Sequence, residues 1–159
     1  ARMNPLRSRI PCNQDVSNLS TDPTLTWPMV RRGNARPVIT IPVSHGELID
    51  KICILTIKQQ QLHGDAHAHV SYELQMLQEV ESASGLTVEP ALRQQLSAVN
   101  TQLWQVEDQL RHKEKRQEFD RAFIALARSV YQLNDERAAL KRKINLQTNS
   151  PLIEQKSYG

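Results

Sequence analysis

From about residue 44 onward, apolar residues recur at the three- and four-residue spacing of amphipathic helices. In the first such stretch they form two adjacent stripes: Leu48, Ile52, Leu55 and Leu62 on one, and Ile49, Cys53 and Ile57 on the other. A face of this width predicts a helix that packs against two neighbours. Ser44 and Glu47 have the spacing of a capping box, which places the helix start at Ser44 and lets the Glu47 carboxylate reach back to the Ser44 N–H. Gly64 and Asp65 should end this helix.

Three further helices are predicted. The second covers about residues 68–82 and is followed by Gly85, and Pro90 suits the first position of the third. The third has an apolar seam with the alternating steps of a heptad pattern: Leu92, Leu96, Val99, Leu103, Val106 and Leu110. A second seam follows, out of register with the first: Phe119, Phe123, Leu126, Val130, Leu133, Arg137, Leu140 and Ile144. We expect a turn within residues 111–120, with Asp120 capping the last helix. A bent continuous helix is the alternative.

These patterns predict an all-α fold: a four-helix hairpin or bundle in which the long helices pack antiparallel, as in a coiled coil. Residues 38–43 are short and rich in β-branched side chains, and Pro42 cannot donate a backbone hydrogen bond. We therefore expect an extended or β segment before the first helix. Residues 38–159 should form a single helical domain.

Residues 1–37 contain five prolines and show no helical or strand periodicity, which predicts a disordered or extended leader. Met29 lies shortly before the patterned region. We interpret residues 1–28 as foreign to the natural protein. A targeting peptide is the alternative, since the leader is rich in Arg, but it lacks a clear amphipathic helix.

The formal net charge of +3 is unevenly distributed. Residues 1–38 carry six arginines and two aspartates, whereas residues 39–159 carry fourteen Lys or Arg and fifteen Asp or Glu. Because the helical part is nearly balanced, the basic isoelectric point does not indicate a nucleic-acid-binding surface on the helices. Nucleic-acid binding through the basic leader is a separate hypothesis, which we do not favour.

The remaining features are typical of a cytoplasmic protein. The two cysteines, Cys12 and Cys53, do not make a disulfide framework. No apolar run approaches the ~18 residues that a membrane span needs, and the leader lacks the apolar centre of a secretory signal. The sequence has no P-loop, no dinucleotide-binding glycine pattern and no nucleophile elbow, so we expect no cofactor.

Arg137 is the most informative single residue, because it occupies a seam position that the heptad pattern assigns to an apolar side chain. A buried guanidinium needs an anionic partner, since an unpaired buried charge is strongly destabilising. Glu107 or Asp108 on the preceding helix could supply it. One interpretation is structural: an ion pair that sets the helix register, or a long side chain whose charged end reaches solvent. The other is an anion- or partner-binding site, with these further candidates: Asn134, Asp135, Arg128 and Lys141.

Two other features invite a functional interpretation. Trp104 is most simply an anchor between helices, and the alternative is a partner-binding hot spot. His63, His67 and His69 lie close enough in sequence to suggest zinc. A loop expected at Gly64 gives them no fixed ligand spacing, so a histidine-rich polar loop is favoured over a metal site.

Several segments together resemble a small bacterial family of unknown function. They are IPVSHGELIDKI at residues 41–52, LWQVED at 103–108, LARSVY at 126–131, NDERA at 134–138 and EQKSY at 154–158. Members of that family begin close to the I-P-V-S-x-G-E-L-I-D-K motif, which agrees with a non-native leader. At position 45 this sequence has His where the family has proline. The resemblance brings no established activity, ligand or catalytic residue. It implies an association with surface-polysaccharide and glycosyltransferase genes, and hence an accessory role in making cell-surface polysaccharide.

The favoured hypothesis is a non-enzymatic helical interaction or assembly protein that forms a homo-oligomer, with a dimer favoured. It rests on the broad face of the first helix and the two seams, which offer more apolar surface than one hairpin buries. The alternative is a small all-helical enzyme, like the helical chorismate mutases, that binds an anionic metabolite in a cation-lined cavity between helices. The candidate residues for that cavity are Asp50, Lys51, Arg128 and Arg137.

Overall fold

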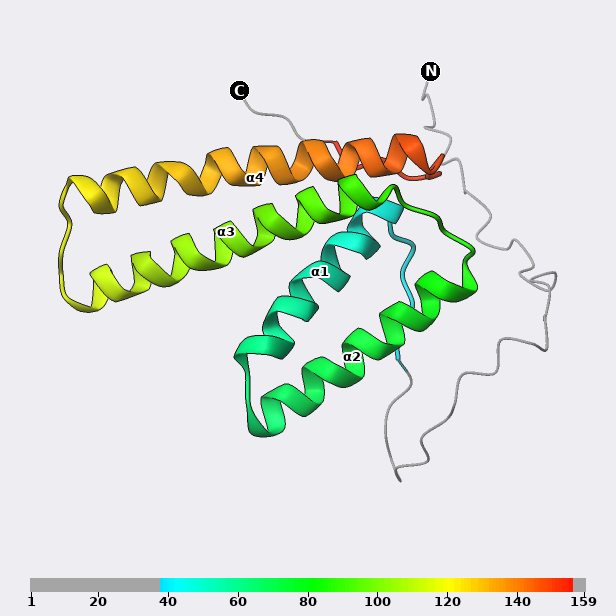
Figure 1. Cartoon of the computed structure of the whole chain (residues 1–159), viewed down its shortest axis with the longest axis horizontal. Coiled ribbons are helices and arrows are strands. Elements are labelled where there is room, and N and C mark those ends of the chain that lie inside the picture. The colour runs from blue at the N-terminus through cyan, green and yellow to red at the C-terminus, as the bar shows by residue number, and fades with distance from the viewer. Residues whose placement is uncertain (1–37, 156–159) are drawn as a thin grey trace, which may run out of the picture. The chain divides into compact units, whose positions relative to one another are not determined.

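The computed structural model describes residues 38–155, which contain four helices (Figure 1). They are α1 (His45–Gln61), α2 (Gly64–Ala83), α3 (Pro90–Lys115) and α4 (Arg121–Gln147). Over the described residues there is no β-strand, so the predicted all-α class is confirmed. Residues 38–43 form neither helix nor strand, and their side chains are exposed. The predicted leader, residues 1–37, lies outside the described residues, as do residues 156–159.

The starts of the first two helices are set locally. The Ser44 hydroxyl accepts a hydrogen bond from the Glu47 N–H at 3.2 Å, so α1 begins where the sequence predicts. The prediction for the second helix is wrong by several residues, because α2 begins at Gly64. Gly64 has a φ of +59°, which lets the chain reverse direction directly after α1 without a longer loop. Asp65 then lies in the first turn of α2, where a negative charge interacts favourably with the helix dipole.

The turn between α3 and α4 lies where it was predicted, and it separates two distinct helices. Gln117 adopts a φ of +56° just after α3 ends. The Glu118 N–H donates to the Lys113 carbonyl at 3.0 Å, which closes the helix end in a Schellman motif without a glycine. Asp120 caps α4 as predicted, accepting from the Phe123 N–H at 2.9 Å. This bond, together with the Lys113 ammonium group beside it, holds the pKa of Asp120 below its ordinary value.

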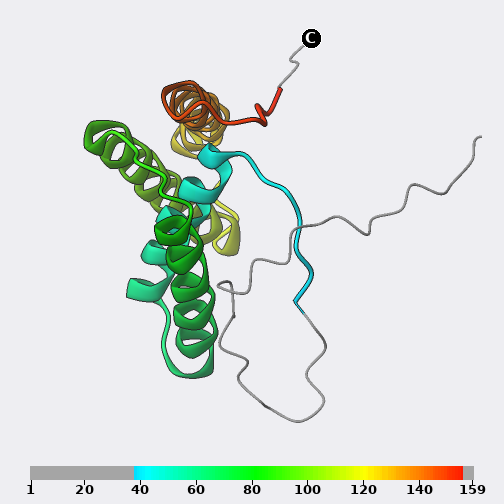
Figure 2. The same ribbon diagram turned by 90° about the vertical axis from the view of Figure 1, so that its right-hand side faces the viewer.

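α1 lies between α2 and the hairpin formed by α3 and α4 (Figures 1 and 2). One apolar cluster joins α1 to the hairpin: Ile49, Cys53, Val88, Leu96, Val99, Leu103, Leu140 and Ile144. A second cluster joins α1 to α2: Leu48, Ile52, Leu55 and Leu74. Leu48, Ile52 and Leu55 of one predicted stripe therefore face α2, and Ile49 and Cys53 of the other face the hairpin.

α1 covers only the base of the α3–α4 hairpin. Figure 1 shows the outer parts of both helices, drawn yellow-green to yellow, extending beyond α1. We call residues 104–135 the arm: the outer part of α3, the turn and the first half of α4. No residue of the arm is buried, although both seams continue through it. None of the described helices is long and apolar enough to cross a membrane.

Candidate functional site

A row of polar side chains on α4 meets the first two turns of α1. The residues of α4 are Arg137, Lys141 and Asn145, whose four-residue spacing places them along one side of the helix. Their partners on α1 follow in the reverse sequence order: as the residue number rises on α4, it falls on α1. We call these three pairs the polar row: Arg137 with Asp50, Lys141 with Glu47, and Asn145 with Gly46.

Asp50 is the most buried charged residue of the row, with 1% of its surface exposed. Its Oδ2 atom lies 3.2 Å from Nε of Arg137. Its Oδ1 atom accepts a hydrogen bond from Nδ2 of Asn100 on α3, at 2.8 Å. One carboxylate oxygen therefore has a hydrogen-bond donor and the other a cationic partner, which offsets the cost of removing the charge from water. These contacts link α1, α3 and α4 at one point.

Lys141 is also buried, with 8% of its side chain exposed. Its Nζ atom contacts Glu47 and lies 2.8 Å from the carboxylate of Glu154, in the segment after α4. Burial by itself lowers the pKa of Lys141, but the hydrogen bonds to Glu154 and Glu47 outweigh it, and the pKa lies above its ordinary value. Lys141 therefore stays protonated at neutral pH, with two carboxylates to compensate its charge.

The segment after α4 folds back over the N-terminus of α1. Asn149 has a φ of +51°, a conformation that asparagine tolerates and that turns the chain at the helix end. The Ser150 hydroxyl accepts from the His45 N–H at 3.2 Å and donates to the Leu152 carbonyl at 2.7 Å. His45 Nδ1 lies 2.9 Å from the Thr148 hydroxyl. This segment thus satisfies a backbone N–H that a helix start leaves without an intrahelical acceptor.

Gly46 lets α1 approach α4 closely. A Cβ atom at this position would lie 2.5 Å from the carbonyl oxygen of Lys141 and 3.0 Å from Oδ1 of Asn145. That oxygen of Asn145 also accepts the Gly46 N–H, at 2.6 Å. A side chain here would push the two backbones apart, so the reason for glycine in this motif is packing between helices.

The prediction that Glu107 or Asp108 pairs with Arg137 is wrong. Glu107 pairs with Arg111 at 3.3 Å, and Asp108 lies 3.5 Å from Nδ1 of His112, both within α3. The two acidic residues lie in the arm, whereas Arg137 lies nearer the base, where α1 covers the hairpin. Burial by α1 therefore decides which carboxylate the guanidinium meets.

The capping-box prediction holds only in part. The Glu47 N–H donates to Ser44 as expected, but the Glu47 carboxylate contacts Lys141 instead of the Ser44 N–H. A charged ammonium group is a stronger partner for a carboxylate than a backbone amide is, and this one lies directly across the α1–α4 contact.

The other predicted site residues are dispersed. Asn134 accepts from Nη1 of Arg137 at 3.4 Å and donates to the Val130 carbonyl at 3.0 Å, so it extends the polar row by one turn. Lys51 forms an exposed ion pair of 2.7 Å with Glu73 on α2. Exposed pairs of this kind contribute little to stability. Three further candidates lie in the arm: Trp104, which is half-buried, and Arg128 and Asp135, which are exposed.

The predicted histidine-rich loop is the start of a helix. His63 precedes α2 directly, and His67 and His69 lie within its first turns. His67 Nδ1 lies 3.5 Å from the Ser71 hydroxyl. Within residues 38–155, no group of three or more His, Cys, Asp or Glu side chains is arranged to hold a metal ion.

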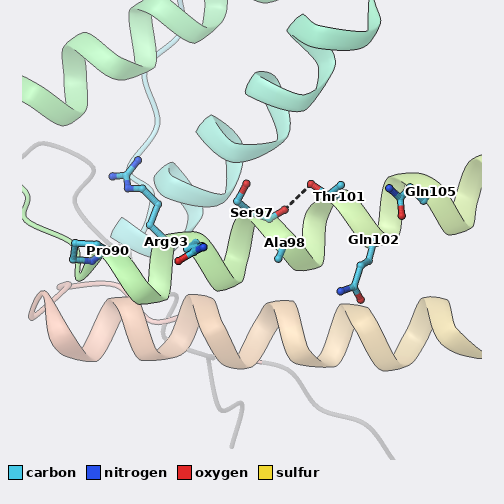
Figure 3. A pocket seen from close by; sticks show the side chains of 8 residues that line it. Pro90, Arg93, Ser97, Ala98, Thr101, Gln102 and Gln105 are labelled. Atoms are coloured by element: carbon cyan, nitrogen blue, oxygen red, sulfur yellow. Dashed lines mark hydrogen bonds between the residues drawn. The ribbon is translucent and has the colours of Figure 1, made fainter.

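A shallow depression lies on α3 (Figure 3). All the residues that line it belong to that helix: Pro90, Arg93, Gln94, Ser97, Ala98, Thr101, Gln102 and Gln105. Arg93 contacts Glu81 on α2, so the positive charge in this lining is compensated. Small-molecule sites usually enclose most of the ligand surface, which a wall made of one helix does not do.

The chain matches the model of a family of unknown function (DUF6165) over residues 39–159. The chain belongs to this family. The match confirms the resemblance to an uncharacterised family, and its range includes the whole polar row and the arm. Neither a curated protein nor a solved structure matches the chain. Family membership brings no activity or ligand.

Sequence reasoning missed part of the polar row. Asn145 had a usable signal, because it continues the four-residue spacing of Arg137 and Lys141 along α4. Asn100 follows a seam residue directly, which is a weaker signal. Glu154 lies in the segment after the last helix, and nothing in its local sequence indicates that it reaches Lys141.

Proposed function

We propose that this chain is a non-enzymatic helical assembly module that self-associates through its arm. The observation that carries the proposal is the exposure of the arm, in which both heptad seams continue without a buried side chain. The most exposed large apolar side chains there are Phe119 at 52%, Ile124 at 56% and Tyr131 at 53%. Concentrated apolar exposure marks interaction surfaces, because covering it removes apolar area from water.

At the base of the same hairpin, a neighbouring helix covers the two seams, and the arm has no such neighbour among the described residues. Where α1 lies on the hairpin, the two seams are buried: Leu96, Val99 and Leu103 on α3, and Leu140 and Ile144 on α4. In the arm the same seams are only half-buried: Val106, Leu110, Phe123, Leu126, Val130 and Leu133. Two helices cannot enclose a core by themselves, and four commonly do. A second copy of the arm supplies two further helices of equal length.

The polar row favours assembly over catalysis. Arg137 pairs with Asp50, and Lys141 contacts both Glu47 and Glu154. An anionic substrate would have to displace these carboxylates, and a displaced Asp50 would remain buried without its cation, which is strongly unfavourable. The row is better suited to holding α1 and the C-terminal segment on the hairpin than to binding a metabolite.

Sedimentation velocity of the full chain over a range of concentrations tests this proposal. We expect an oligomer, with a dimer as the smallest assembly. Ile124→Glu should shift the population toward monomer, because it places a charge in the exposed surface of the arm. Tyr72→Glu is the matched control, since Tyr72 is equally exposed, at 54%, but lies on α2.

A chain that sediments as a monomer at every concentration would overturn the proposal. An oligomer that resists Ile124→Glu but dissociates with Tyr72→Glu would also overturn it, because the contact would then lie on α2.

A further inference from the structure

We infer that the arm binds a second copy of this chain in one particular orientation, with the two α4 helices antiparallel and a two-fold axis close to Tyr131. This inference rests on the proposed function and adds the partner's orientation and the contacts that fix it. Three features of α4 support it: an apolar stripe that α3 does not use, the symmetry of that stripe about Tyr131, and the charges beside it.

The stripe lies beside the seam that faces α3. Ile124, Ala127, Tyr131 and Ala138 follow one another at helical spacing and therefore share one side of α4. The first three are exposed and Ala138 is half-buried. The two alanines leave room for another helix to approach to the ~8–10 Å that is usual between packed helices.

The stripe is symmetric about its centre. Ile124 and Ala138 each lie seven residues, or two helical turns, from Tyr131. If a two-fold axis passes near Tyr131, Ile124 of each copy packs against Ala138 of the other, so a large side chain meets a small one twice. The contact extends about 21 Å along the helix at ~1.5 Å per residue. A surface that complements itself in this way is what a two-fold dimer requires.

The charges beside the stripe are complementary in the same orientation. Arg128 lies three residues before Tyr131 and Asp135 four residues after it. Neither side chain has an ion-pair partner within residues 38–155. Antiparallel packing about Tyr131 places Arg128 of each copy beside Asp135 of the other, which makes two equivalent ion pairs. Parallel packing on the same stripe would leave Arg128 and Asp135 of different copies on opposite edges of the contact, so the charges select the antiparallel arrangement.

Charge reversal tests this orientation in the full chain. Arg128→Asp and Asp135→Arg should each weaken self-association, because each replaces two attractive contacts with two repulsive ones; we expect the dissociation constant to rise by about tenfold or more. Mixing the two variants should restore association as a heterodimer, since every contact across the axis is then attractive. The double variant with both reversals should also associate normally.

Rescue by mixing separates an effect on association from an effect on folding. Residues 128 and 135 are seven positions apart on one helix, too far to pair within a single copy. The matched control is Glu136→Arg, which reverses a neighbouring exposed charge about 140° around α4 from Tyr131 and should leave association unchanged. If the variants fail to rescue each other, or if Glu136→Arg weakens association as much as Asp135→Arg, the inferred orientation is wrong.

Disulfide trapping gives a second, independent measurement. A residue near a two-fold axis lies close to the same residue of the other chain. Tyr131→Cys in a Cys12→Ser background should therefore form a covalent dimer on mild oxidation. Gln132→Cys should not, because residue 132 is also exposed but lies about 100° around α4 from Tyr131. The remaining thiol, Cys53, is buried.

The outcomes distinguish the inference from the proposed function. A monomeric wild-type chain overturns both. An oligomer that sediments unchanged with Arg128→Asp and with Asp135→Arg, and that forms no Tyr131→Cys disulfide, leaves self-association in place but overturns this orientation. A different protein that binds to the arm in place of a second copy would also overturn it.

Discussion

Asp50 is buried, and polar partners from two other helices replace the water that it loses on folding. Arg137 supplies an ionic contact from α4, and Asn100 supplies an amide from α3. The two members of the ion pair differ in burial: 30% of the Arg137 side chain is exposed, but only 2% of the Asp50 side chain. The guanidinium therefore keeps part of its contact with water, whereas the carboxylate keeps almost none. Breaking the pair should therefore be costly chiefly because of Asp50.

Arg137→Leu should lower the free energy of unfolding by about 2–3 kcal/mol, somewhat less than breaking a fully buried pair costs, because the guanidinium is partly solvated. The double variant Asp50→Asn with Arg137→Leu should lose less than the single variant, since it removes the buried charge as well. Urea unfolding followed by circular dichroism measures both. A single variant as stable as the wild type would show that the fold does not need this pair.

The end of each helix in the hairpin is set by one residue in the left-handed conformation. Gln117 lies two residues after the end of α3 and Asn149 two residues after the end of α4, with φ values of +56° and +51°. Both residues have a Cβ that lies close to the carbonyl oxygen in this conformation. The short side chain of asparagine can offset the cost by hydrogen-bonding to the nearby backbone, whereas the longer glutamine side chain is less suited to this. The α3 end therefore carries strain that the α4 end largely avoids. This strain lies at the tip of the arm, away from the polar row.

Gln117→Gly should raise the free energy of unfolding by roughly 0.5–1 kcal/mol, because glycine adopts a positive φ without steric cost. Asn149→Gly is the control and should gain less, since asparagine already tolerates the conformation. Paired urea titrations compare the two. A loss of stability in Gln117→Gly would mean that the hydrogen bond from the Gln117 side chain to the Glu114 carbonyl, at 3.0 Å, outweighs the backbone strain.

At the scale of the whole molecule, α1 is the element on which the other helices depend. Its two stripes belong to different apolar clusters, and Leu86 in the α2–α3 connection packs against both. The polar row adds contacts from α1 to α3 and α4, and the segment after α4 covers the start of α1. The clusters should therefore lose their packing together when α1 detaches.

Cys53 offers a probe of that opening, because it lies in the cluster between α1 and the hairpin. Burial raises the pKa of the Cys53 thiol to about 11. At pH 8 roughly one thiol in a thousand would then be ionised in the folded state, and the thiolate is the reactive form. In a Cys12→Ser background, labelling with a thiol reagent should be slow and should accelerate with urea below the unfolding transition. Labelling at the rate of a free thiol in buffer would show that this cluster opens readily by itself.

The helices and most of their boundaries follow from the sequence alone because the forces that set them are local. The stripes of α1, the Ser44 and Asp120 caps and the turn before α4 depend on residues within a few positions of one another, and the structure has them as predicted. The start of α2 was predicted wrongly because a glycine can end one helix and begin the next, and the local sequence does not decide between them.

The partner of Arg137 and the uncovered part of the seams were decided by the tertiary structure. The sequence marked Arg137 as a charge in an apolar seam, but Asp50, Glu107 and Asp108 were all chemically suitable partners. The choice depends on where α1 lies on the hairpin, and that position comes from apolar packing and the close approach at Gly46. The same packing buries the base and leaves the arm exposed, since heptad spacing shows which side chains need a neighbour but not how far a neighbouring helix extends.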